Sequence, residues 1–187
     1  MTLHQIDVNA VQPQAWRNGG GQTRELWTWP STGPWQLRIS RADIDRDGPF
    51  SAFPGVRRWF AVLQGTGVEL QFGDARHILH AGDPALCFDG AQAPGCRLLD
   101  GATQDLNLMT HGGDALMERV RAQLPWTTPY RMRGLYTTAA GVWRDGAQQR
   151  VLPAHTLLWD DAPATRPWQF EAEAETLAWW LGFSPAK

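Results

Sequence analysis

A first group of residues suited to ligand binding lies at positions 16–25, where the sequence reads WRNGGGQTRE. Its three glycines lack a Cβ, so the backbone can adopt positive φ values and another group can approach its N–H donors closely. Asn18, Thr23 and Arg24 add side chains that make directed hydrogen bonds. A tight turn between two strands explains the same residues without a ligand, because Asn-Gly is a strong hairpin signal. The candidate contacts are Asn18, Gly20, Thr23 and Arg24.

Two arginines form a second candidate, because a rigid loop with the sequence GPFSAFPG at positions 48–55 precedes them. The loop delivers Arg57 and Arg58 into the start of a strand at 59–64. Alternation along a strand places the two side chains on opposite faces, so at most one of them lines an interior. The alternative is that both are surface arginines.

A third candidate is the segment DLNLM at positions 105–109. A strand here places Asp105 and Asn107 on one face and the two leucines on the other. A half-exposed strand with its polar face in water has the same pattern. In a closed barrel, however, an interior face can be polar when the barrel holds a small ligand. Arg38 and Ser40 share one face of the alternating segment 35–40, and this face could likewise be exposed to water or line a barrel interior.

The elements that would position these residues are β-strands. Candidate strands in the first part of the chain are 35–40, 59–64, 68–72, 76–79, 97–99 and 104–110. Those in the second part are 134–138, 142–144, 148–152, 156–159, 168–171 and 176–183. Many short strands, repeated at roughly eight to twelve residues with Gly- and Asp-rich turns between them, are typical of a sandwich or barrel. We therefore predict an all-β fold.

The break between the two sets of strands lies within positions 112–128. One helix is predicted there, from Ala115 to Gln123, because Asp114 is a good N-cap and Pro125 follows shortly after. We predict a barrel with a ligand pocket at 1–111, a connecting segment with the short helix at 112–128, and a second barrel at 129–187.

Composition narrows the functional classes. The net charge is −2 and the basic residues are scattered, so no surface is predicted for nucleic acid or an anionic membrane. Because the N-terminus has no signal-like pattern and the apolar runs are too short for a bilayer, the expected location is the cytoplasm. Cys87 and Cys96 are expected to be free thiols in that compartment. The 11 tryptophans are expected to be mostly packing residues of the β structure.

Three motifs, taken in order, resemble the HutD/Ves family: WRNGGGQTRE at 16–25, PFS with FPG at 49–55 followed by Arg58, and DLNLM at 105–109. The resemblance covers nearly the whole chain. It implies a bicupin, with two small antiparallel β-barrels in one compact chain, and it adds Ser51 to the candidate contacts. Arg57 stands where the family often has an acidic residue, which leaves Arg58 as the better match.

The resemblance also implies a role in histidine utilisation, in which the protein senses or binds an acidic intermediate such as N-formylglutamate. Ves members are described as stress-induced, and the sequence does not separate the two branches. Many cupins bind a metal through a His-x-His pair, which this chain lacks. His77 and His80 are three residues apart and would point to opposite faces of a strand. We predict no metal and no cofactor.

Our first hypothesis is a metal-free binding protein for a small carboxylate. Asn18 and Thr23 would supply directed hydrogen bonds, and Arg58 would bind the carboxylate, with Arg38 as a second cation. Asp105 or Asn107 would face an amide of the ligand. The alternatives are a metal-independent isomerase or hydrolase that uses Glu25 or Asp105, and a stress-related interaction protein with an exposed apolar patch. A homodimer is compatible with the sequence.

Overall fold

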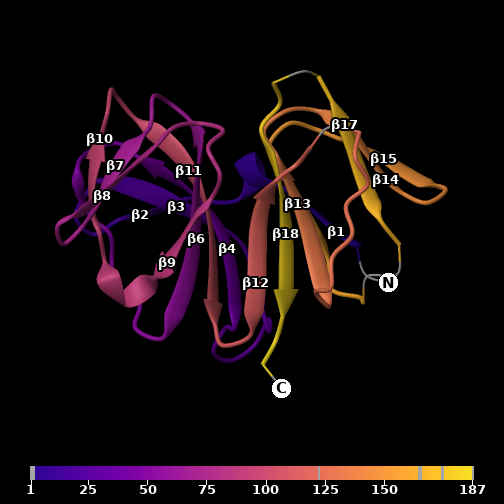
Figure 1. Cartoon of the computed structure of the whole chain (residues 1–187), viewed down its shortest axis with the longest axis horizontal. Helices are drawn as coiled ribbons and strands as arrows, with labels where there is room; N and C mark the ends of the chain where they lie inside the picture. The colour runs from indigo at the N-terminus through magenta and orange to yellow at the C-terminus, as the bar shows by residue number, and fades with distance from the viewer. Residues whose placement is uncertain (1–2, 122, 164–165, 174, 187) are drawn as a thin grey trace. The chain divides into compact units, whose positions relative to one another are not determined.

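The computed structural model describes residues 3–121, 123–163, 166–173 and 175–186, and these residues form β-strands, two short 3₁₀ turns and loops (Figure 1). The prediction of an all-β fold is therefore confirmed. The chain divides into two compact units. The first unit is Val11–Gly112, and the second unit combines Met1–Ala10 with Gly113–Lys187. None of the helices in the described residues is long and apolar enough to cross a membrane.

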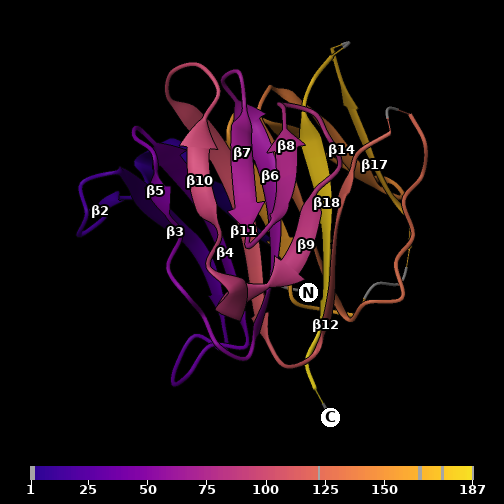
Figure 2. The ribbon, with the colours of Figure 1, turned by 60° about the vertical axis from the view of Figure 1, so that its left-hand side comes forward.

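The first unit contains two antiparallel sheets. Its six-stranded sheet has the order β2 (Gln14–Ala15), β3 (Gly21–Trp29), β4 (Leu37–Ile44), β11 (Thr103–His111), β6 (Val56–Gln64) and β9 (Leu86–Asp89). Its four-stranded sheet has the order β5 (Gly48–Pro49), β10 (Gly95–Leu98), β7 (Val68–Phe72) and β8 (Ala75–Leu79). Figure 2 shows strands of the four-stranded sheet lying over β6 and β11 of the other.

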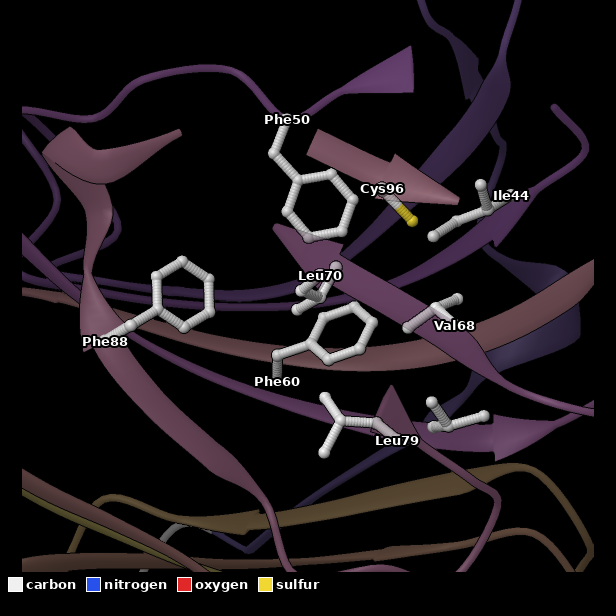
Figure 3. Close-up of a cluster of buried hydrophobic side chains, with 9 residues drawn as sticks. Ile44, Phe50, Phe60, Val68, Leu70, Leu79, Phe88 and Cys96 are labelled. Carbon is white, nitrogen blue, oxygen red and sulfur yellow. The ribbon is translucent and has the colours of Figure 1, made fainter. Parts of the chain in front are cut away.

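The core of the first unit fills the space between these two sheets. Alternate residues of β6, β7 and β10 point into it, including Phe60, Val68, Leu70 and Cys96 (Figure 3). The Phe50 ring joins this cluster from the loop after β5, with its centroid 5.5 Å from that of Phe60. Burying a side chain such as Phe60, Val68 or Leu70 stabilises the fold by about 1.5–3 kcal/mol, so this cluster helps to hold the two sheets face to face.

The second unit also has two antiparallel sheets. The larger has the order β1 (Leu3–Asp7), β16 (Thr156–Asp160), β13 (Met132–Thr137), β18 (Ala178–Ser184) and β12 (Asp114–Arg119). The smaller has the order β15 (Gln148–Leu152), β14 (Gly141–Asp145) and β17 (Trp168–Ala172). Tryptophan dominates the core between them, and the rings of Trp126 and Trp180 stack with centroids 4.9 Å apart. In both units the strands belong to two separate sheets rather than to one closed ring of hydrogen bonds.

The predicted helix from Ala115 to Gln123 is wrong. Residues Asp114–Arg119 form β12, which pairs with β18, and Ala122 lies outside the described residues. Ala115 and Met117 are buried while Leu116 and Glu118 are more exposed, a period of two that suits a strand. Asp114, the residue that suggested an N-cap, makes a local hydrogen bond in the strand: its side chain accepts from the Ala115 N–H. Tertiary pairing with β18 decides the structure of this segment.

The first residues of the chain also differ from the sequence prediction, which placed them in the first barrel. β1 pairs with β16 along its whole length and so belongs to the second unit. Strand order in a sheet depends on pairing between distant segments, which local residue patterns do not specify.

Candidate functional site

A cavity of about 420 Å³ lies against the inward face of the six-stranded sheet of the first unit. Side chains from β3, β4, β6 and β11 form its polar wall. The β2–β3 turn and the loop after β5 complete it. The lining residues are Gln14, Ala15, Trp16, Arg17, Asn18, Thr23, Arg38, Ser40, Ala42, Pro49, Phe50, Ser51, Phe53, Arg58, Asp105, Asn107 and Met109.

Strand register explains why polar side chains from three strands meet in this cavity. In one row of the six-stranded sheet, Arg38 on β4 lies beside Met109 on β11, which lies beside Arg58 on β6. The next inward-facing row pairs Ser40 with Asn107, and the one after it pairs Ala42 with Asp105. Alternation keeps each row on the same face. Residues far apart in sequence therefore form one continuous polar surface.

The glycine run shapes the turn between β2 and β3. Gly19 has a φ of +68°, and its N–H donates to the carbonyl of Trp16. A Cβ at Gly21 would overlap the backbone oxygen of Asp43 on the neighbouring strand β4. The Asn18 side chain accepts a hydrogen bond from the Gly20 N–H at 3.0 Å. The hairpin interpretation of this segment is therefore correct, and the same hairpin supplies part of the cavity wall.

Arg58 is a buried cation in the wall of the cavity. Its side chain lies against the rings of Phe50, Phe53 and Phe88, with centroid distances of 4.9, 5.7 and 5.2 Å. Nη2 donates to Oδ1 of Asn107 at 2.8 Å, whereas Nε and Nη1 have no hydrogen-bond partner among the described residues. Burial lowers the pKa of Arg58 to about 10, so the group still carries its charge at neutral pH. A buried cation with two unsatisfied nitrogens is suited to binding an anion.

Asn107 connects Arg58 to a buried carboxyl group. Because Oδ1 of Asn107 accepts from Arg58, its Nδ2 is the donor toward Oδ1 of Asp105. Asp105 is only 1% exposed, and its Oδ2 has no hydrogen-bond partner among the described residues. Burial raises the pKa of Asp105 to about 8, and the charge of Arg58 opposes that rise. Asp105 therefore retains its proton at pH values where an ordinary aspartate is ionised.

A second cation, Arg38, lies nearer the solvent. Its Nε donates to Oε2 of Glu25 at 2.7 Å, and the Glu25 side chain is 43% exposed. Glu25 does not line the cavity. This carboxylate fixes the orientation of Arg38 from outside the cavity.

The turn and the aromatic loop supply the remaining wall. Nε1 of Trp16 donates to Oγ1 of Thr23 at 2.7 Å, which leaves the threonine hydroxyl hydrogen available for another acceptor. Phe50 and Phe53 place apolar surface opposite these polar groups, and Ser51 lies between them in the sequence. The cavity thus has cationic, hydrogen-bonding and apolar walls.

The cavity brings together seven of the nine residues proposed from the sequence: Asn18, Thr23, Arg38, Ser51, Arg58, Asp105 and Asn107. Arg24 and Gly20 do not line it. Arg24 follows Thr23 on β3, so it points to the other face of the sheet, where Nη1 lies 2.6 Å from Oδ2 of Asp43. The Gly20 carbonyl accepts hydrogen bonds from the Asp45 and Arg46 N–H groups, which closes the turn.

Sequence reasoning did not select several apolar residues that line the cavity. Trp16, Phe50 and Phe53 lie within the segments singled out above, but only polar side chains were chosen as contacts. Met109 continues the alternation of Asp105 and Asn107 along β11, and Ala42 continues that of Arg38 and Ser40 along β4. Extending each alternation to the next residue on the same face would have identified both Met109 and Ala42.

The cavity does not fit a metal ion of the type that cupins hold. Its lining contains one carboxylate, Asp105, and neither histidine nor cysteine. Within the described ranges, no group of three or more His, Cys, Asp or Glu residues is placed to hold a metal ion. Both cysteines are free thiols, Cys87 exposed and Cys96 buried.

Comparison with other sequences gives matches over most of the chain. A family model described as HutD matches residues 8–180. Protein Ves of Escherichia fergusonii is 27% identical over 188 residues, which cover 98% of each chain. An uncharacterized 21.2 kDa protein in the hutC 3′ region of Pseudomonas putida is 39% identical over 114 residues, which cover 59% of this chain and 57% of that protein.

Solved structures share the fold. A conserved protein of unknown function from Pseudomonas aeruginosa PAO1 superposes with a TM-score of 0.89 at 27% identity, covering 98% of this chain and all of that one. HutD from Pseudomonas fluorescens SBW25, in a structure described as a formate condition, has a TM-score of 0.87 at 23% identity, and each chain is covered completely. A cupin 2 conserved barrel domain protein from Leptotrichia buccalis has a TM-score of 0.54 at 12% identity, covering 97% of this chain and 96% of that one. The fold is therefore a cupin-like β fold.

Proposed function

The chain belongs to the HutD family, and from its cavity we propose that it binds a small carboxylate in the first unit without a metal ion. The observation that carries this proposal is Arg58. Its charge is buried among three phenyl rings, one nitrogen is occupied by Asn107, and the other two have no hydrogen-bond partner among the described residues. An isolated buried charge is unfavourable, so a bound anion would stabilise this arrangement.

The ligand that we propose is an acidic intermediate of histidine utilisation such as N-formylglutamate. Its carboxylates suit Arg58 and Arg38, and its amide suits the hydrogen-bonding groups of Asn107 and Thr23. A volume of about 420 Å³ is within the range of small-molecule sites. The Pseudomonas putida relative, which is named for the hutC 3′ region, supports a role beside hut genes. We propose that the protein modulates this pathway by binding its intermediate.

Calorimetric titration with N-formylglutamate, glutamate and formate tests the proposal. Charge-assisted hydrogen bonds contribute about 1.5–3 kcal/mol each, so Arg58→Gln should weaken carboxylate binding by at least about tenfold. Arg57→Gln is the matched control, because Arg57 is the exposed neighbour on the same strand and points to the other face. Equal affinities in the two variants, or no heat with any of the three ligands, would refute the carboxylate site.

Asp105 favours one alternative function. A buried carboxyl whose pKa lies near 8, in a cavity beside a cation, is typical of a general acid or base. A metal-independent isomerase or hydrolase that acts on the same carboxylate would use it. Analysis of the ligand after prolonged incubation separates the two functions: a binding protein returns the ligand unchanged, and an enzyme converts it. Glu25, the other acid considered from the sequence, lies outside the cavity lining.

A further inference from the structure

We propose that Asp105 takes part in ligand binding as a neutral acid, donating an Oδ2–H hydrogen bond to the same ligand carboxylate that Arg58 binds. This inference rests on the proposed function and makes it more specific. The preferred ligand group is then a carboxylate that can accept from both a cation and a carboxylic acid. At pH values below the pKa of Asp105 its carboxyl group already carries the proton. At pH values above it, binding of each anion is accompanied by the uptake of one proton.

The hydrogen-bond geometry places the proton of Asp105. Arg58 Nη2 donates to Asn107 Oδ1, and Asn107 Nδ2 donates to Asp105 Oδ1. This order fixes the amide orientation, because a guanidinium has no acceptor. Oδ1 of Asp105 therefore already receives a donor, whereas Oδ2 has no partner among the described residues and is buried. A proton on Oδ2 converts this unsatisfied acceptor into a donor beside the cavity.

The charges around the cavity lead to the same assignment. Arg58 is its buried cation, and Arg38 is already balanced by Glu25. An ionised Asp105 would cancel the charge of Arg58 and repel an anionic ligand from the space beside it. A neutral Asp105 leaves the charge of Arg58 for the ligand carboxylate, and Arg17 adds an exposed cation to the cavity lining. The site can therefore hold a carboxylate beside Asp105 without two like charges in contact.

The charged groups near Asp105 on neighbouring strands are few. From β6, Arg58 lowers its pKa, and from β4, Arg41 lowers it while Asp43 raises it. From β10, Cys96 is the titratable neighbour, and burial raises the pKa of its thiol to about 12, so it adds no charge at neutral pH. Burial of Asp105 outweighs the two arginines, and its pKa rises to about 8.

This arrangement predicts a specific pH dependence of binding. For a group with a pKa near 8 that must be protonated in the complex, affinity is nearly constant up to pH 7 and falls by about tenfold between pH 7 and pH 9. Proton uptake follows the same curve, from a small fraction of a proton per ligand at pH 7 to nearly one at pH 9. Asp105→Asn keeps a neutral donor at this position, so its affinity should be nearly independent of pH over this range.

The test is calorimetric titration of the full chain with N-formylglutamate, glutamate and formate at pH 7 and pH 9. Each titration is repeated in two buffers with different ionisation enthalpies, so that the number of protons taken up is measured directly. Asp105→Asn is compared with wild type, and Asp74→Asn, in the exposed turn between β7 and β8, is the matched control. The inference expects proton uptake at pH 9 in wild type and Asp74→Asn, and none in Asp105→Asn.

Three results would overturn the inference while leaving the carboxylate site intact. The first is binding to wild type at pH 9 without proton uptake, and the second is the same loss of affinity at pH 9 in Asp105→Asn as in wild type. The third is loss of binding at pH 7 in Asp105→Asn, which would show that an ionised Asp105 accepts a donor from the ligand. Absence of binding for every probe would overturn the proposed function and the inference together. Infrared spectroscopy of the ligand-free protein at pH 7 adds a test without ligand: the carbonyl band of a protonated carboxylic acid should be present in wild type and missing in Asp105→Asn.

Discussion

At the scale of single residues, Asp105 and Arg58 are two buried ionisable groups on adjacent strands whose partners give them different charge states. Arg58 compensates for the loss of water with three aromatic rings and one amide oxygen. Asp105 has a single donor, from Asn107. The cation therefore keeps its charge at neutral pH, and the carboxyl group gives up its charge by holding a proton.

The raised pKa of Asp105 makes the stability of the protein depend on pH. In the unfolded chain this carboxyl has a pKa of about 4, and in the folded protein it is about 8. Between these values the folded state holds a proton that the unfolded state releases. Stability contributed by the protonated group is therefore fully present below about pH 4 and is lost as the pH rises to about 8. Asp105→Asn should remove this dependence.

Unfolding of wild type and Asp105→Asn by denaturant at pH 5 and pH 8 measures this effect. The difference in stability between them should shift in favour of the variant by on the order of 3 kcal/mol from pH 5 to pH 8, because a full proton difference changes stability by about 1.4 kcal/mol per pH unit. All other titrating groups cancel in the comparison. Parallel stability profiles for the two proteins would show that Asp105 is ionised in the folded state.

At the scale of elements, the β2–β3 hairpin closes one side of the cavity, and one side-chain hydrogen bond, from Trp16 to Thr23, crosses the hairpin. Trp16 Nε1 donates to Thr23 Oγ1, and the backbone pairs Trp16 N–H with the Gly21 carbonyl and Gly19 N–H with the Trp16 carbonyl. β2 is an edge strand of only two residues. The other hydrogen bonds of the turn all involve Gly20, which donates to Asn18 and accepts from the N–H groups of residues 45 and 46. The turn should therefore open more readily than the rest of the sheet.

Trp16→Phe tests the contribution of this bond while keeping an aromatic ring. Loss of the indole donor should increase hydrogen exchange at the amides of Trp16 and Gly19 several-fold and weaken carboxylate binding by a few-fold. Exchange should be unchanged in β11, which is paired on both sides. Hydrogen exchange with mass spectrometry, together with titration of the variant, measures both effects. Unchanged exchange in the turn would mean that the glycine-rich backbone alone sets its stability.

The same elements show what the sequence could predict. Period-two alternation predicted that Arg57 and Arg58 point to opposite faces and that Asp105 and Asn107 share one, because side-chain direction along a strand depends only on local geometry. It did not decide which of those faces is interior. Thr23 and Arg24 were both chosen as contacts because no strand was predicted over positions 21–29, whereas in β3 these neighbours point to opposite faces. The helix prediction failed at β12 for a different reason. Pairing with β18, more than sixty residues away, overrides the local N-cap signal of Asp114.

Similarly, the sequence could indicate which polar residues share one face of a strand but not which of them touch. The relay from Arg58 through Asn107 to Asp105 joins two strands that are adjacent only in the folded sheet. The link between Trp16 and Thr23 crosses the hairpin, and its existence depends on the turn geometry. The strand patterns alone did not distinguish a sandwich from a barrel, and the expectation of a bicupin came from the family resemblance.

At the scale of the whole molecule, each unit contains a buried arginine, and the two arginines differ in how their nitrogens are paired. In the first unit Arg58 has unsatisfied nitrogens beside a cavity. In the second unit Arg133 is paired with two carboxylates: Nη2 lies 3.0 Å from Oδ2 of Asp145 and 3.6 Å from Oδ2 of Asp160. Its Nη1 donates to the Arg166 carbonyl, its guanidinium lies over the Trp168 ring at 4.2 Å, and Nε has no hydrogen-bond partner among the described residues. We therefore assign ligand binding to the first unit and a structural role to this cluster.

This assignment predicts that Arg133→Met lowers stability without changing ligand affinity. The substitution leaves Asp145 and Asp160 buried without their cation, and breaking a buried ion pair in this way costs about 3–5 kcal/mol. Arg144→Met is the matched control in the same unit, because Arg144 forms a partly exposed pair with Glu171 at 2.6 Å, and such pairs contribute about 1 kcal/mol or less. Thermal unfolding should separate the two variants by several degrees, while titration at a temperature where both are folded should give the wild-type affinity. A large loss of carboxylate affinity in folded Arg133→Met would instead place part of the binding function in the second unit, since direct contact with Arg133 would then be the simplest reason for it.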